Sequence, residues 1–359
     1  MTFQSADFPL NADEIYRAID IDQSLDITDA KQLIIHQDFE NFRPAIERFV
    51  LKVVHSEKLG YAIKKDSSGR PIVRELAFGQ QHFSALKAYV QAFIPGYYFS
   101  PHVELFFQCC RYLSVGDWAS LKPQDRLSSG LFVGEIFNCL LCELRKGVKR
   151  RKFTRKLAAR ELTTDRAFKS CKNYFNTLMD VYARLLVLRV DFGYRKDYAA
   201  SVSPKELKSD LKRFLDSKRT SPRLTTLVGY IWRLEYGDEK KLHLHMVFFL
   251  NGSESQNDPW LAEEYGKQWQ SSCASGMGIY FNCNRKKLGY KFLGVGRIEY
   301  HSYEKRWNFI NKALAYLAKK EQYILSKLTR SMRCMGHGEA PDKSGLVRLG
   351  RPRSKLSDL

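Results

Sequence analysis

The most constraining feature of this chain is a pair of apolar stretches, residues 225–237 and 242–250, with the polar sequence GDEKK around their junction. Both stretches are rich in leucine, β-branched and aromatic residues, which is typical of buried strands. A short polar connection that contains Gly237 is typical of a β-hairpin. The sequence therefore predicts a buried antiparallel strand pair.

The second strand of this hairpin begins with His243 and His245, separated by one leucine. Alternate residues of a strand share a face, so both imidazoles point the same way. If residues 237–241 form the loop, Glu235 lies opposite His243, at the roughly 4.5–5.5 Å Cβ spacing of cross-strand neighbours. This set predicts a site for a divalent ion, Mg²⁺ or Mn²⁺, and Zn²⁺ also fits the ligands chemically. The alternative for H-x-H alone is a pair of satisfied surface histidines.

The elements around the hairpin alternate between strand and helix. Further strands are predicted at residues 185–194, 278–283 and 292–300, and helices at 203–215 and 259–272. The predicted fold class is α+β, with a mainly helical N-terminal region followed by a central antiparallel sheet flanked by helices.

Three parts are predicted along the chain. Residues 1–157 form a mainly helical accessory domain in which no catalytic set is found. Residues 158–328 form the sheet-containing domain. Residues 329–359 are rich in glycine and proline and are expected to form a mobile basic tail.

Charge is distributed unevenly between these parts. Residues 1–144 carry 14 Lys and Arg against 18 Asp and Glu, whereas residues 145–359 carry 45 against 21. The run RKGVKRRKFTRK, residues 145–156, has eight basic residues in twelve. An excess of this size in one part of the chain indicates a polyanionic partner, for which nucleic acid is preferred over an anionic membrane surface.

The expected environment is the reducing cytoplasm. No apolar run is long enough to span a membrane, and the start MTFQSADFPLNADE lacks the apolar region of a secretory signal. Cys139 and Cys142 form a C-x-x-C without a second pair at zinc-site spacing, so they are interpreted as core thiols. No membrane partner is expected.

A long helix is predicted over residues 304–328, with an apolar stripe that includes Tyr303 and Trp307. Tyr316 lies at the edge of this stripe, and Lys319 is its neighbour one turn later. A phenol has a pKa near 10, and a nearby cation favours the nucleophilic phenolate. Tyr316 is therefore the candidate nucleophile. Tyr323, on nearly the same helix face, is a second candidate.

The three motifs together resemble the HUH endonuclease superfamily. HLH at residues 243–245 is similar to its histidine motif, and Tyr316 with Lys319 to its tyrosine motif. Over roughly residues 170–325 the chain resembles inovirus-type (filamentous-phage gene II-like) replication initiators and their prophage relatives. Arg189 and Asp191 match the upstream motif, but the sequence assigns them no role.

This resemblance implies a nickase that initiates rolling-circle replication in the cytoplasm of a bacterial host cell. A tyrosine would attack one strand of single-stranded or hairpin origin DNA and keep the 5′-phosphate. The host helicase and polymerase would then be partners. Alternatives are a DNA-binding repressor without catalysis and an HUH relaxase or transposase. A barrel hydrolase is disfavoured, because only 114 residues follow His245 and a (β/α)₈ barrel needs about 250 in all.

Overall fold

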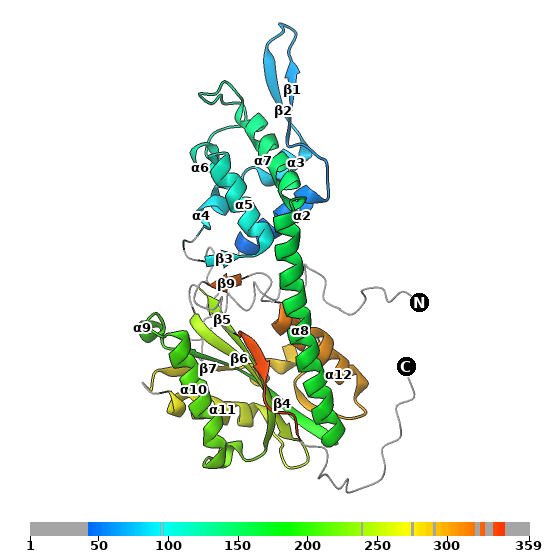
Figure 1. Ribbon diagram of the computed structural model, residues 1–359, viewed down its shortest axis with the longest axis vertical. Helices are drawn as coiled ribbons and strands as arrows, with labels where there is room; N and C mark the ends of the chain where they lie inside the picture. Colours follow the sequence, from blue (N-terminus) through cyan, green and yellow to red (C-terminus); the bar gives the residue numbers. More distant parts are fainter. Residues whose placement is uncertain are drawn as a thin grey trace.

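The computed structural model describes residues 42–341, apart from residues 94, 96, 238–239, 274–275, 290–291, 320–323 and 327–332. These residues form an N-terminal helical region and a sheet-containing region, which are joined by one long helix (Figure 1). The predicted α+β class is confirmed. No helix in the described part of the chain is long and apolar enough to cross a membrane.

The N-terminal region packs helices around an aromatic core and carries a projecting β-hairpin (Figure 1). Its elements are α2 (Phe42–Val54), β1 (Tyr61–Lys65), β2 (Pro71–Glu75), α3 (Ala77–His82), α4 (Leu86–Gln91), β3 (Tyr97–Phe99), α5 (Pro101–Tyr112), α6 (Val115–Trp118) and α7 (Val133–Val148). The interpretation of Cys139 and Cys142 as core thiols was wrong. Both are exposed, because α7 buries the opposite face, which carries Phe137, Leu140 and Leu144.

Helix α8 (Arg151–Val181) joins the two regions and is about 46 Å long at 1.5 Å per residue. Its second half buries Phe168, Phe175 and Leu178 against the sheet, whereas its first half is largely exposed. The predicted boundary between residues 157 and 158 falls inside this helix. The basic run 145–156 therefore spans the end of α7 and the start of α8 rather than a linker.

The sheet-containing region is built on a central antiparallel sheet of order β10-β5-β6-β4-β7, with β8 also paired to β4. Its elements are β4 (Arg184–Tyr194), α9 (Lys196–Ala199), α10 (Pro204–Asp216), short 3₁₀ turns η2 (Ser217–Arg219) and η3 (Pro222–Leu224), β5 (Leu227–Gly237), β6 (Lys241–Asn251), α11 (Asp258–Ser272), β7 (Gly278–Asn282), η4 (Cys283–Gly289), β8 (Gly296–Glu299) and β10 (Met335–His337). Because β10 belongs to this sheet, the prediction that the whole of residues 329–359 forms a mobile tail was wrong.

The sheet is covered on both faces, as alternation along β6 shows. Leu244, Met246 and Phe248 point into the core beneath α10 and α11. Val247 and Phe249 point to the other core, which α8 and the helical segment after β8 complete. The two candidate histidines share this second face, at the end where the apolar residues stop.

The helix predicted over residues 304–328 is interrupted. The structure has α12 (Tyr303–Asn308), a π-helical segment η5 (Phe309–Leu314) and α13 (Ala315–Lys319), followed by the strand β9 (Ile324–Ser326). Strand β9 pairs with β3 of the N-terminal region. This distant strand pairing overrides the local helical pattern.

Two packing predictions for this segment were also wrong. Tyr303 and Trp307 are 57% and 47% exposed instead of belonging to the core stripe. Tyr316 is only 6% exposed and belongs to the core rather than to its edge. The i→i+5 bonds of η5 change the angular spacing, so projection at 100° per residue fails beyond it.

Candidate metal centre

The candidate metal centre lies on the β5–β6 hairpin, in the predicted register. Glu235 is paired with His243, and Tyr236 with Leu242, although the strands extend one pair further than predicted, to Gly237 and Lys241. His243 and His245 are both buried on the central strand β6. The hairpin alone therefore places the two imidazoles and the carboxylate on one face of the sheet.

The three ligand atoms converge. Oε2 of Glu235 lies 3.2 Å from Nε2 of His245 and 3.6 Å from Nε2 of His243. One ligand atom from each residue lies within 4.8 Å of the others, a spacing suited to a single ion. Both histidines offer Nε2 because their Nδ1 atoms face other acceptors: the Lys241 carbonyl at 3.0 Å and Asp191 Oδ1 at 2.7 Å.

These outer contacts suit a metal ligand. A ring nitrogen that donates to a carbonyl or carboxylate fixes the tautomer and leaves the other nitrogen's lone pair for a metal. Burial lowers the pKa of His243, an effect that the nearby Glu235 carboxylate opposes. His243 is thus held in its neutral, metal-binding form. The N, N, O donor set fits a divalent ion with open coordination positions.

Two arginines flank the candidate ligands, Arg233, which is buried, and Arg189, which is half-buried. Arg233 is opposite His245 in the β5–β6 register, and its Nε lies 3.8 Å from Oε1 of Glu235. Arg189 on β4 places its Nε 3.8 Å from Oδ1 of Asp191. These positive groups balance the two carboxylates.

Tyr316 reaches the same face of the sheet from α13. Its ring centre lies 5.9 Å from the Arg189 guanidinium carbon, so Arg189 lies between the tyrosine and Asp191. Lys319 is the last residue of α13, and the placement of its side chain lies outside the described residues. Tyr323 also lies outside them.

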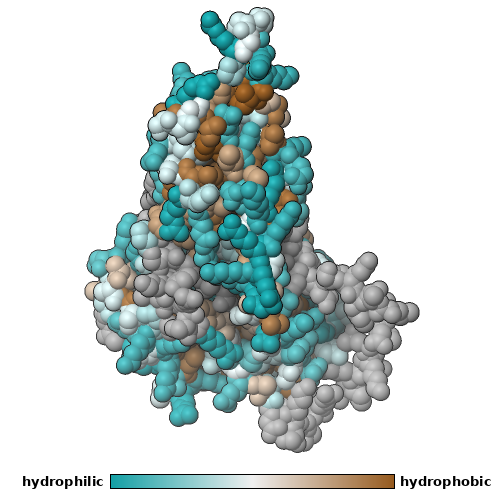
Figure 2. Space-filling model, turned by 45° about the horizontal axis from the view of Figure 1, so that its top comes forward, coloured by the Kyte–Doolittle hydropathy of each residue, from teal (hydrophilic) through white to brown (hydrophobic). Residues whose placement is uncertain are grey.

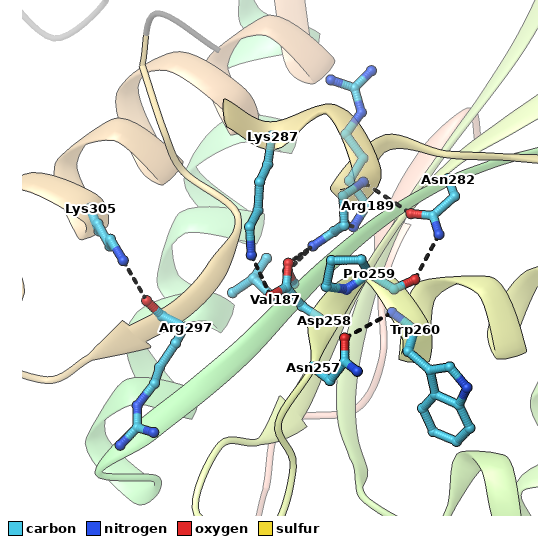
Figure 3. A network of polar contacts seen from close by, with 11 residues as sticks. Val187, Arg189, Asn257, Asp258, Pro259, Trp260, Asn282, Lys287, Arg297 and Lys305 are labelled. Atoms are coloured by element: carbon cyan, nitrogen blue, oxygen red, sulfur yellow. Dashed lines mark hydrogen bonds and ion pairs between the residues drawn. The ribbon is translucent and has the colours of Figure 1, made fainter. Parts of the chain in front are cut away.

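A second polar network holds Arg189 at its backbone. Strands β7 and β8 pair with opposite ends of the same β4 edge, and the Asn284 carboxamide fills the gap between them. Asn284 accepts from Arg189 N at 2.7 Å and donates to Val187 O at 3.1 Å. It also donates to Asp258, which pairs with Lys287 beside this strand (Figure 3).

The sequence prediction named the three candidate metal ligands and Tyr316, but gave no role to Asp191 or Arg189 and missed Asn284. Asp191 and Arg189 could have been found from their positions in the strand. Two charges at alternate residues within the apolar strand LLVLRVDFGY must share one face and require partners there. Nothing in the sequence marks Asn284, because its role depends on where β7 ends and β8 begins.

The family match includes all the residues of the candidate metal centre. A profile for the YagK/YfjJ C-terminal domain matches residues 149–338, which is more than half of the chain. The chain belongs to the YagK/YfjJ C-terminal domain family. The YagK/YfjJ domain begins just before α8 and ends just after β10, so it includes the metal-ligand candidates and Tyr316. No curated protein and no solved structure matches the chain significantly.

Proposed function

We propose that this protein is a metal-dependent, site-specific endonuclease that nicks single-stranded DNA through Tyr316. One observation carries the proposal: Glu235, His243 and His245 converge on the sheet face that also carries Tyr316. Arg189 contacts both the tyrosine ring and Asp191, which orients His245. A purely structural histidine pair would need neither the carboxylate nor a neighbouring phenol.

In this reaction the Tyr316 oxygen attacks the scissile phosphorus after losing its proton. The P–O3′ bond breaks, the DNA 3′-oxygen leaves and is protonated, and the 5′-phosphate stays on the tyrosine. A bound Mg²⁺ or Mn²⁺ would supply Lewis-acid polarisation of the phosphate. Arg189 supplies positive charge for the phosphate oxygens, and the sequence motif assigns the same role to Lys319. The free 3′-OH can prime a polymerase, as initiation of rolling-circle replication requires.

Charge supports a DNA substrate. The excess of basic residues lies beyond residue 144, in the part of the chain that also carries the candidate centre. On α8, Arg151, Arg155, Arg166 and Lys169 are exposed and share one face, opposite the buried Phe168 and Phe175. This basic α8 face is suited to DNA phosphates.

A DNA-binding protein without cleavage activity is the second candidate. The burial of Tyr316 and His245 favours it, because a scissile phosphate must reach both. Relaxase or transposase activity would use the same chemistry as replication initiation and differ only in the DNA processed.

The decisive experiment looks for a covalent adduct between the protein and DNA. Wild type, Tyr316→Phe, Tyr323→Phe and His243→Ala are incubated with Mn²⁺ and a labelled pool of single-stranded oligonucleotides, then resolved on a denaturing gel. We expect an adduct in wild type and Tyr323→Phe, and none in Tyr316→Phe or His243→Ala. Tyr323→Phe is the matched control, since it also removes one phenol oxygen from this part of the chain.

The opposite pattern would reassign the nucleophile to Tyr323. Loss of the adduct in both tyrosine variants would indicate two cooperating tyrosines. If no protein forms an adduct with Mn²⁺, Mg²⁺ or Zn²⁺ while all bind DNA, the non-catalytic candidate is correct.

A further inference from the structure

Two aromatic side chains on α12 face outward in a part of the domain that is otherwise well packed. Tyr303 is 57% exposed and Trp307 is 47% exposed. They are four residues apart, so they lie on the same side of the helix. Isolated exposed aromatic residues are common, but a neighbouring Tyr–Trp pair beside a candidate catalytic segment requires an explanation.

One cation lies beside the Trp307 ring, and a second lies beside the neighbouring Tyr300 ring. Lys312 Nζ lies 5.5 Å from the centre of the Trp307 ring and 4.4 Å from that of Phe292. The Arg306 guanidinium lies 5.3 Å from the Tyr300 ring centre and donates to the Tyr300 carbonyl. The patch therefore combines aromatic faces with positive charge, which is the combination that binds unpaired nucleotides.

The aromatic pair is connected to Tyr316 by continuous helical structure. Segment α12 continues through η5 into α13, and Tyr316 follows Trp307 by nine residues, roughly 13 Å at the α-helical rise. Residues of η5 and α13 pack on the sheet face that carries the metal ligands. A DNA strand over α12 would therefore be close to the candidate centre.

We propose that Tyr303 and Trp307 form a stacking platform for unpaired bases of the DNA strand next to the scissile phosphate. Lys312 and Arg306 would contact the phosphates between those bases. This inference rests on the proposed function for its position, but binding can be measured without cleavage. Stacking tolerates any base, so the platform would hold the strand without reading its sequence.

An apolar protein partner fits the patch less well. Such interfaces have cores depleted of charge, whereas Lys312 lies directly over two of the aromatic rings here. A protein partner is therefore treated as one outcome of the test.

The test uses the full chain with Tyr316→Phe, which prevents cleavage. Fluorescence anisotropy measures binding of a labelled oligothymidylate to this protein and to the same protein with Tyr303→Ala and Trp307→Ala. We expect the double substitution to weaken binding by about 10-fold or more. Tyr303→Phe with Trp307→Phe should retain most of the affinity, because the ring faces remain.

Trp260→Ala is the matched control. Trp260 is 57% exposed, lies on α11 against the opposite face of the sheet, and points away from the polar network in Figure 3. Its loss should leave the affinity unchanged. Tryptophan fluorescence gives a second readout, since oligothymidylate should quench the wild type and Trp260→Phe, but quench Trp307→Phe less.

Full affinity in the double-alanine protein would overturn the platform, as would an equal loss in Trp260→Ala. Full affinity together with a change in sedimentation would instead assign the patch to protein association. The proposed function can be rejected independently of the platform. If oligothymidylate binds through Tyr303 and Trp307 but wild type forms no adduct, the platform is retained and the nickase proposal is rejected. An adduct with normal binding by the platform variants would remove only the platform.

Discussion

Nδ1 of His245 lies 2.7 Å from Oδ1 of Asp191, its cross-strand neighbour on β4. The contact sets the orientation of a ring that is completely buried, and it directs Nε2 towards Glu235. Asp191 is thus a positioning residue for a candidate metal ligand. Arg189 lies close to both Asp191 and the Tyr316 ring, and it therefore connects the candidate ligands to the tyrosine.

Asp191→Asn should weaken Mn²⁺ binding by about 10- to 100-fold, the usual cost of losing an outer-shell partner. The amide is neutral and makes the histidine ligand less basic. Isothermal titration calorimetry measures the affinity. Asp210→Asn is the control, because Asp210 is equally buried but bonds Tyr194 under the other face of the sheet. Unchanged Mn²⁺ affinity in Asp191→Asn would remove Asp191 from the metal centre.

Asn284→Ala should destabilise the protein by about 1–3 kcal/mol, because Arg189 N and Val187 O lose their buried partner. Adduct formation should also fall, since Arg189 is no longer fixed at its backbone. Asn138→Ala is the control. The Asn138 carboxamide likewise bridges backbone groups at Tyr61, but in the N-terminal region. Urea unfolding should show similar losses of unfolding free energy in the two variants. Only Asn284→Ala should reduce the amount of adduct formed per folded molecule.

The basic α8 face should determine part of the salt dependence of DNA binding. Each phosphate contact contributes about 0.9 to the slope of log affinity against log salt for duplex DNA and about 0.7 for single strands. Replacing Arg151, Arg155, Arg166 and Lys169 with glutamine should therefore flatten the slope by up to about 3. Gel shifts at several salt concentrations measure it.

Glutamine at Lys205, Lys208 and Lys212 on α10 is the comparison, with three charges removed instead of four, because these exposed lysines lie on the other layer of the domain. An equal change per charge removed in both sets would show only a general charge effect. A slope that is unaffected by the α8 substitutions would exclude that face from DNA binding.

His82 should make the N-terminal region sensitive to acid. Burial lowers its pKa, with a smaller contribution from Lys52, and its ring packs 4.6 Å from Phe78 between ring centres. The unfolded state, with a pKa near 6.5, then takes up the proton first. Stability is full above that pH and falls as the pH drops towards the lower folded pKa.

Thermal unfolding of metal-free protein at pH 7.5 and 5.5 measures this effect. The loss of melting temperature between these pH values should be smaller for His82→Leu than for wild type. An identical loss would show that other groups set the acid sensitivity.

The elements that could be predicted from sequence are those fixed by neighbours along the chain. The hairpin register follows from its loop length and from alternation, and these two features are enough to place Glu235 opposite His243. Helix α10 likewise follows from local signals, with Ser203 capping it and Pro204 at its first turn. Tyr316 could be named, but its burial could not, because the π-helical segment before it rotates the helix.

The remaining features depend on partners far along the chain. Strand β9 carries no pattern that distinguishes it from the end of a helix, and it forms because β3 offers an edge more than 200 residues earlier. The exposed Cys139 and Cys142 reflect which side of α7 meets the N-terminal core.

In Figure 2 most of the visible described surface is hydrophilic, although apolar residues also reach it over the N-terminal region.

The pairing of β3 with β9 gives the two regions a second connection besides α8, because β9 follows α13 and precedes β10 of the central sheet. A body attached by one helix can swivel about it, whereas a body held at two points cannot turn without straining one of them. Strand β9 begins eight residues after Tyr316. A load applied to the N-terminal region, such as a partner that grips the β1–β2 hairpin, would therefore pull on the segment that carries the proposed nucleophile.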